Sequence, residues 1–328
     1  MNYLVDPYEV YQTKLLPEVG ATQERYLKVE FLKRHAEFDT FLLGGSRMGT
    51  TAPADVENVI PQSHVYNFFV SSGNQYDNLM HGKWLLSTRP NLKTIYVQVD
   101  WPETIGPFTE SLQYLSHPEV SGKSGRGFLG QYVFTFPYRA LEFKLLNNFR
   151  NKGDFKFSLQ NGYFHFPQKD RFIERDCAGY VNGDEAFRRN VAELPPSAAQ
   201  KKIIDESLAD LAQLVQAANK RSVKVVLFVP PHNHKFLDKI NIEEYEYFLT
   251  RLGRIAPYWN FGFYSSLTTN DCNYYETSHY LRDVGAAMFS AMAQGSRPPY
   301  VRFVSQANMS SEMEFMLNNF RLQRAGGR

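Results

Sequence analysis

Short hydrophobic stretches alternate with stretches of helical periodicity along most of the chain. The hydrophobic stretches are rich in β-branched and aromatic residues and stop at Gly, Ser, Asp or Pro, as is typical of buried strands. They cover residues 38–43, 63–70, 92–99, 223–229 and 259–264. Apolar side chains recur at spacings of three and four over residues 78–88, 198–221, 242–252 and 284–292, which predicts helices. This alternation predicts parallel βαβ units and therefore an α/β fold.

The rest of the chain divides around this pattern. Residues 1–34 are predicted to form an N-terminal leader that packs on the body. Residues 35–300 are predicted to form one α/β/α domain, interrupted over about 102–196 by a segment rich in aromatic residues, Gly and Asn. A long irregular segment inside such a domain is usually a functional insertion or cap. Residues 301–328 are predicted to form a tail with an amphipathic helix over 310–324.

The composition is that of a folded globular protein. The chain has 328 residues, of which 43% are hydrophobic and 15% aromatic, so it is long enough to bury a large core. Its 36 Lys and Arg against 34 Asp and Glu leave a formal charge of +2, and no run of basic residues exceeds two. Nucleic acid is therefore not an expected partner, because its binding depends on concentrated positive charge.

Neither the cysteines nor the apolar stretches predict a disulfide-rich protein, a CxxC site or a membrane protein. Cys177 and Cys272 have no CxxC pattern, so they are treated as ordinary thiols, and a single long-range disulfide is left open. No stretch reaches the roughly 18 apolar residues of a membrane span. Residues 1–11 contain Asp6 and Glu9 and lack the apolar core of a signal peptide. The sequence as given predicts neither a transmembrane segment nor an export signal.

Polar clusters follow the predicted strands. In an open parallel sheet, ligands bind beyond the carboxyl ends of the strands, so residues at those ends are candidates for function. The clusters are Gly45-Ser46-Arg47, Ser72-Gly73-Asn74, Asp100, PPHNH at residues 230–234, and ETSH at residues 276–279. We expect the fold to gather them at one edge of the sheet.

Among these clusters, Ser46, His279 and Glu276 predict nucleophilic catalysis. A serine hydroxyl needs an imidazole within hydrogen-bond reach and an acid that holds this imidazole in the right tautomer. The tight Gly-Gly-Ser turn is expected to expose the hydroxyl and to aim the backbone N–H groups of Ser46 and Gly73 at a developing oxyanion. The alternative is that Ser46 is a turn residue that caps the next helix.

Three blocks at these positions resemble the SGNH/GDSL hydrolase superfamily. They are DTFLLGGSR at residues 39–47, YNFFVSSG at 66–73 and YYETSHY at 274–280, and their order and spacing cover roughly residues 38–292. Within the superfamily, the chain is similar to bacterial proteins of cell-envelope polysaccharide and O-acylation pathways that carry GSSR-type nucleophile turns. The resemblance implies a flavodoxin-like three-layer α/β/α sandwich and ester hydrolysis or acyl transfer without metal or cofactor.

The resemblance also implies roles for single residues. Ser46 is the implied nucleophile, Gly73 an oxyanion donor and His279 the base. The acid of the superfamily, usually Asp, stands three residues before the histidine, where this chain has Glu276. Asp271 is therefore a second candidate acid.

A further departure concerns the oxyanion site. The superfamily places an asparagine after the third strand, and this chain has Asp100 there. An ionised carboxylate would repel an oxyanion. Either Asn74 takes the role, or Asp100 is structural, or the acyl chemistry is weak or lost.

The remaining polar residues of the clusters have open roles. His232 and His234 follow a strand as an HxH pair, which predicts pocket lining or charge stabilisation; the alternative is a metal site with His279 as third ligand. Arg47 is expected to hold either an anionic group of the substrate or a structural carboxylate such as Asp100. The predicted substrate pocket consists of Arg47, Asp100, His232 and His234.

The sequence as a whole predicts a serine esterase or O-acyltransferase-like enzyme that acts on an acylated carbohydrate or a similar small ester. The alternative is a catalytically inactive protein that binds polysaccharide or a partner. Residues 2–8 resemble the segment that follows an N-terminal membrane anchor in the envelope proteins. The compartment therefore stays open between the cytoplasm and the cell envelope, as does the oligomeric state.

Overall fold

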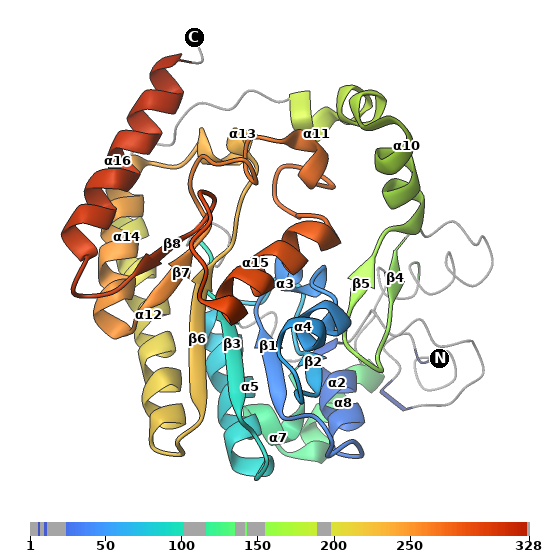
Figure 1. Ribbon diagram of the computed structural model, residues 1–328. Coiled ribbons are helices and arrows are strands. Elements are labelled where there is room, and N and C mark those ends of the chain that lie inside the picture. Colours follow the sequence, from blue (N-terminus) through green and yellow to red (C-terminus); the bar gives the residue numbers. More distant parts are fainter. Residues whose placement is uncertain are drawn as a thin grey trace.

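A six-stranded sheet forms the centre of the computed structural model (Figure 1). The structure describes residues 6, 10–11, 24–101, 116–134, 142, 155–188 and 198–326. The strands of this sheet are β1 (Thr40–Leu43), β2 (Val65–Asn67), β3 (Thr94–Gln98), β6 (Lys224–Val229), β7 (Tyr258–Asn260) and β8 (Arg302–Val304). Their order is β2-β1-β3-β6-β7-β8, and all neighbours are parallel except β8, which runs antiparallel to β7.

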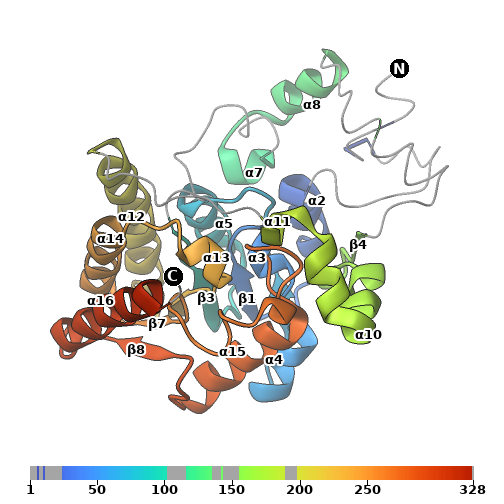
Figure 2. The same cartoon turned by 90° about the horizontal axis from the view of Figure 1, so that it is seen from above.

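Helices pack on both faces of the sheet, because successive strand side chains point to opposite faces. Phe41, Val97 and Leu227 share one buried cluster with α5, α12, α14 and α16. Leu42, Tyr96 and Phe228 share another cluster with α4 and α15. Figure 2 shows these two groups of helices on opposite sides of the strands. Their bounds are α4 (Pro53–Val59), α5 (Gln75–Thr88), α12 (Ala198–Asn219), α14 (Ile242–Ile255), α15 (Arg282–Gln294) and α16 (Met309–Gly326).

Shorter elements lie before, between and after these strands. Close to the carboxyl ends of the strands are α3 (Ser46–Gly49), α13 (His234–Leu237) and the 3-10 helix η1 (Asp271–Asn273). The segment predicted as an insertion contains a second, two-stranded sheet. Its described elements are α7 (Pro118–Ser121), α8 (Gly125–Phe134), β4 (Lys156–Phe157), β5 (Phe164–His165), α10 (Pro167–Gly183) and α11 (Glu185–Arg188). Among the helices that the structure describes, none combines the length and hydropathy needed to cross a membrane.

The α/β prediction is confirmed, and the helices on both faces of the mostly parallel sheet are compatible with a three-layer sandwich. The five predicted strands are present, and each is shorter than the hydrophobic stretch that predicted it. Strand β8 was not predicted, because residues 302–304 are too short to show an alternation. It adds an antiparallel edge to the sheet, and α16 packs on α14 beside it.

Two predicted regions are described only in part. From the leader, α2 (Glu24–Leu32) buries Val29 and Leu32 in the same cluster as α5, and residues 1–5, 7–9 and 12–23 lie outside the described residues. From the cap over 102–196, residues 102–115, 135–141, 143–154 and 189–196 lie outside them as well. The described remainder of the cap is more regular than predicted, since α10 alone has 17 residues.

The structure corrects the prediction for the cysteines. Cys177 in α10 and Cys272 in η1 form a disulfide across a sequence separation of 95 residues, so the treatment of both as ordinary thiols was wrong. Spacing could not reveal this pair, because a disulfide needs the two Cα atoms within about 7 Å, and only the packing of the cap brings them together.

Candidate active site

The site begins at a sharp turn after β1. Gly44 and Gly45 leave the strand, and Ser46 is the first residue of α3. A Cβ atom at Gly44 would lie 2.8 Å from the Cβ atom of Gln98 in β3, which only glycine avoids. Gly45 in turn passes close to the loop after β2, since a Cβ atom there would lie 3.3 Å from the carbonyl oxygen of Gly73. The close approach of these two loops fixes Ser46 at the edge of the sheet.

Ser46, His279 and Glu276 form a hydrogen-bonded chain. His279 Nε2 lies 2.8 Å from Ser46 Oγ, and His279 Nδ1 is hydrogen-bonded to Glu276 Oε1. A carboxylate accepts hydrogen bonds, so Nδ1 carries the proton and Nε2 is left to accept from the serine hydroxyl. The side chains of His279 and Glu276 are 28% and 29% exposed, so a substrate can reach them from solvent.

Glu276 is held by its own loop. Its carboxylate accepts the backbone N–H groups of His279, at 2.7 Å, and Ser278, at 3.0 Å, and the Ser278 hydroxyl at 2.9 Å. Burial raises the pKa of this carboxyl, but the hydrogen bonds from His279 and Ser278 outweigh it and lower the pKa to about 2. Glu276 is therefore ionised at neutral pH and can orient the imidazole.

The loop that carries Glu276 and His279 is closed where it begins and ends. Tyr274 and Tyr280 form an isolated antiparallel bridge, and Leu281 N–H donates to Asn273 O at 2.8 Å. The Tyr280 hydroxyl lies 3.1 Å from Thr51 Oγ1, five residues after Ser46. These contacts tie the His279 loop to the segment that follows Ser46.

The predicted oxyanion donors are only partly where they were expected. Ser46 opens α3, so its N–H is among the donors that have no partner within the helix. The Gly73 N–H instead donates to Val70 O at 2.9 Å inside its own turn. Asn74 is the N-cap of α5, and its side-chain oxygen accepts the N–H of Asp77 at 3.0 Å. Sequence patterns miss such local turn and cap bonds, which compete for the same groups.

Arg47 and His232 surround the carboxylate of Asp100. Arg47 Nη1 lies 2.6 Å from Asp100 Oδ2, and His232 Nε2 lies 2.8 Å from Asp100 Oδ1. Gln98 Nε2 donates to the same carboxylate at 2.8 Å. All four side chains are buried. Asp100 is one of the two partners predicted for Arg47, and the structure shows this pair.

The side chains of this cluster shift one another's pKa values. Burial raises the pKa of Asp100, but the charge of Arg47 and the hydrogen bonds from His232 and Arg47 overcome this effect and hold that pKa far below its ordinary value. Burial lowers the pKa of His232 more than Asp100 raises it. Arg47 Nε also donates to Ser278 O at 3.0 Å, so the cluster contacts the loop that carries Glu276 and His279.

Removing the carboxylate of Asp100 should destabilise the protein strongly. Asp100→Ala leaves the buried Arg47 guanidinium without its partner, and we expect a loss of about 3–5 kcal/mol in the free energy of unfolding, measured by urea denaturation. The matched control is Asp205→Ala, because Asp205 pairs with Arg251 at the surface, where the side chains are 42% and 40% exposed. This control should cost at most about 1 kcal/mol. Equal losses for the two variants would contradict a structural role for Asp100.

His234 and Asp271 form a pair with each other. Asp271 accepts from Asn233 Nδ2 at 2.7 Å, and its carboxylate lies 3.1 Å from His234 Nε2 and 3.2 Å from Lys235 Nζ. Glu276, and not Asp271, is therefore the carboxylate bound to His279 in this structure.

The metal alternative finds no support in the geometry. His232, His234 and His279 each bind a different carboxylate. In the part of the chain that the structure describes, no three His, Cys, Asp or Glu side chains are grouped to hold a metal ion.

Some contributors to the site were not predicted from sequence. Gln98 could have been found, because it stands two residues before Asp100 and so shares its side of the chain. The Ser278 carbonyl and the ring of Phe164, whose centroid lies 6.5 Å from that of His279, carry no signal in sequence. No model of a protein family matches the chain, and a search of curated proteins finds no match. The SGNH/GDSL resemblance therefore rests on the motifs alone.

Proposed function

We propose that this protein is a serine esterase or O-acyltransferase that acts through Ser46, His279 and Glu276. The observation that carries the proposal is the continuous hydrogen-bonded chain from Glu276 through His279 to the Ser46 hydroxyl, with 2.8 Å between His279 Nε2 and Ser46 Oγ. A nucleophile, a base and an acid in this arrangement are what acyl transfer by serine requires.

In the proposed reaction, His279 Nε2 takes the Ser46 proton as Oγ attacks the carbonyl carbon of the ester. The new bond forms an acyl-enzyme, the ester C–O bond breaks, and His279 returns the proton to the leaving oxygen. The Ser46 N–H donates to the developing oxyanion. Water then releases the acyl group in a hydrolase, or a sugar hydroxyl takes it in a transferase.

The fold favours the same assignment. The order β2-β1-β3-β6-β7 of the parallel strands matches the flavodoxin-like order 2-1-3-4-5. Ser46 follows β1, which is the first of these strands in the sequence. We propose a flavodoxin-like three-layer sandwich of the SGNH/GDSL type. An acylated carbohydrate is the proposed substrate class, on the strength of the resemblance to envelope O-acylation proteins.

A binding protein without catalysis is the second candidate. Asp100 in place of an oxyanion asparagine favours it, as does the Gly73 N–H that donates to Val70 O. Against it, the charge of Asp100 is compensated by Arg47 at 2.6 Å, so the carboxylate does not stand unpaired beside an oxyanion. A binding site also has no need of an oriented imidazole beside a serine.

The proposal is tested with a chromogenic ester and a covalent probe. We expect the protein to hydrolyse p-nitrophenyl acetate and to react with a fluorophosphonate, and mass spectrometry should place the adduct on the peptide that contains Ser46. A protein that neither turns over the ester nor takes the label would overturn Ser46 as a reactive nucleophile and favour the binding protein.

A further inference from the structure

Helix α10 of the cap holds the loop that carries Glu276 and His279. Tyr180 in α10 donates its hydroxyl to Tyr275 O at 2.6 Å, directly before Glu276 in the chain. The Tyr275 hydroxyl in turn is hydrogen-bonded to Asp170, also in α10. Both tyrosine side chains are buried. Helix α10 therefore binds Tyr275 through both the backbone carbonyl and the side-chain hydroxyl of that residue.

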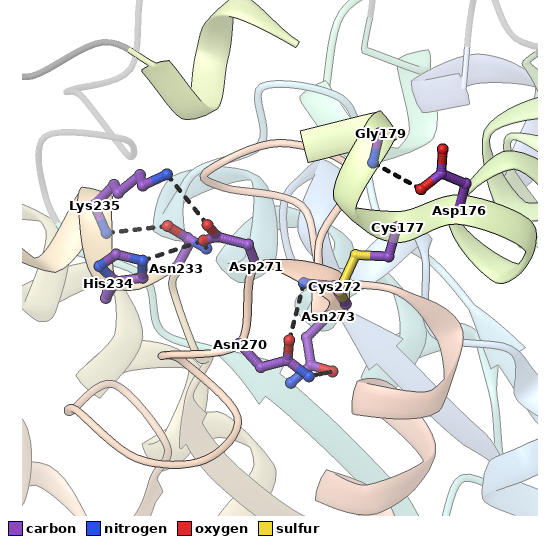
Figure 3. The surroundings of a disulfide bond; sticks show 10 residues. All are labelled: Asp176, Cys177, Gly179, Asn233, His234, Lys235, Asn270, Asp271, Cys272 and Asn273. Carbon is purple, nitrogen blue, oxygen red and sulfur yellow. Dashed lines mark hydrogen bonds and ion pairs between the residues drawn. A yellow bond between two sulfur atoms is a disulfide. The ribbon is translucent and has the colours of Figure 1, made fainter. Parts of the chain in front are cut away.

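The disulfide adds a covalent link between the same two segments (Figure 3). The backbone of α10 breaks at Asp176, whose carboxylate accepts the N–H of Gly179 at 2.9 Å and so caps the second part of the helix from Cys177 onward. Asn270 likewise accepts the N–H of Cys272 at 3.1 Å and caps η1. Side-chain caps thus fix the backbone on both sides of the bond.

The same 3-10 helix is anchored to the sheet from its other side. Asp271, next to Cys272, is bound by Asn233, His234 and Lys235 at the start of α13, which follows β6 (Figure 3). Residues 271–273 therefore join the cap to the sheet edge, only three positions before Glu276.

We infer that α10, with its disulfide, is a redox-sensitive brace that positions the acid and base of the site. The inference rests on the proposed function. Cys177, Cys272, Tyr180 and Tyr275 are positioning residues, since they act on the substrate only through the Glu276–His279 loop. A small displacement of a catalytic group can cost as much as about a hundredfold in rate, so the bond between the cysteines sets how well the site works.

Cleavage of the brace needs a dithiol as reductant. The dithiol supplies two electrons and two protons, the S–S bond breaks, Cys177 and Cys272 become thiols, and the dithiol closes to its own disulfide. Both cysteines are half-buried, so a small dithiol can reach them. Because disulfides persist in oxidising surroundings and are reduced by thiols, the oxidised protein is the braced form and the reduced protein is the released form.

The test compares the oxidised and reduced protein. After treatment with dithiothreitol, confirmed by thiol titration, we expect kcat for p-nitrophenyl acetate to fall by about ten- to a hundredfold with little change in KM. Amide hydrogen exchange should rise in residues 271–281 and stay unchanged in the central strands. The double variant Cys177→Ser/Cys272→Ser should behave like the reduced protein and should not respond to the dithiol.

A second pair of variants serves in case the cysteine variant does not fold. Tyr180→Phe removes one hydroxyl from the brace and should lower kcat and loosen residues 271–281. Tyr247→Phe is the matched control, because the Tyr247 hydroxyl in α14 lies 3.0 Å from Asp205 in α12. This variant should leave both kcat and hydrogen exchange unchanged.

Unchanged kcat and unchanged exchange in residues 271–281 after reduction would overturn the brace. A rise in hydrogen exchange that is uniform over the whole protein would also overturn the brace, because the disulfide would then stabilise the whole fold and not this loop in particular. If the oxidised protein neither turns over the ester nor reacts with the fluorophosphonate, the proposed function fails, and hydrogen exchange alone still decides whether α10 holds the loop.

Discussion

Ser46→Ala and His279→Ala should each lower kcat for ester hydrolysis by about 10⁴- to 10⁶-fold. The first variant removes the attacking oxygen, and the second removes the group that accepts its proton across the 2.8 Å between His279 Nε2 and Ser46 Oγ. The measurement is steady-state hydrolysis of p-nitrophenyl acetate. The absorbance of the released p-nitrophenolate gives the rate, from which the uncatalysed rate is subtracted.

The double variant gives the sharper result. Because the serine and the histidine act as a unit, Ser46→Ala/His279→Ala should be no slower than either single variant. Ser63→Ala is the matched control, since Ser63 Oγ only caps a turn by donating to Ile60 O at 2.7 Å, and it should keep full activity. Losses that multiply in the double variant would mean that Ser46 and His279 act independently. A Ser46→Ala protein that still hydrolyses the ester would mean that another group attacks the substrate.

The proximity of Ser46 and His279 could be predicted from sequence because both residues stand in short blocks at strand ends. Ser46 follows a hydrophobic stretch and two glycines, and His279 precedes a helix with clear periodicity. A parallel sheet brings the carboxyl ends of its strands to one edge, so the class of fold already places such residues near each other. The 2.8 Å contact between them is a matter of packing and needed the structure.

Other features depend on contacts between distant segments and left no pattern in the sequence. The disulfide joins residues 95 positions apart, and the Arg47–Asp100 pair joins a turn to a strand end. The sequence did raise the pairing of Arg47 with Asp100 as one of two roles, and it could not choose between them. The Gly73 N–H was assigned to an oxyanion because a turn bond to Val70 O cannot be seen in residue types.

Glu276→Gln should lower kcat by about 10⁴-fold, because an amide in place of the carboxylate can no longer hold the His279 imidazole with its proton on Nδ1. The same variant has a signature in pH. Hydrogen bonds lower the pKa of Glu276 to about 2 against burial, so its contribution to stability is complete above about pH 4.5 and is lost as pH falls toward 2. The difference in unfolding free energy between wild type and variant should therefore shrink from pH 7 to pH 3.

Asp271→Asn separates the two candidate acids, since it makes the same kind of change five residues away. Asp271 binds Asn233, His234 and Lys235, so its loss should loosen η1 and lower kcat by less than about tenfold, a positioning effect. Glu276→Asp keeps the charge and shortens the side chain by one methylene, and it should recover part of the rate lost in Glu276→Gln. If Asp271→Asn proves the more damaging variant, the acid of the site is Asp271, and the hydrogen bond between Glu276 and His279 serves only to shape the loop.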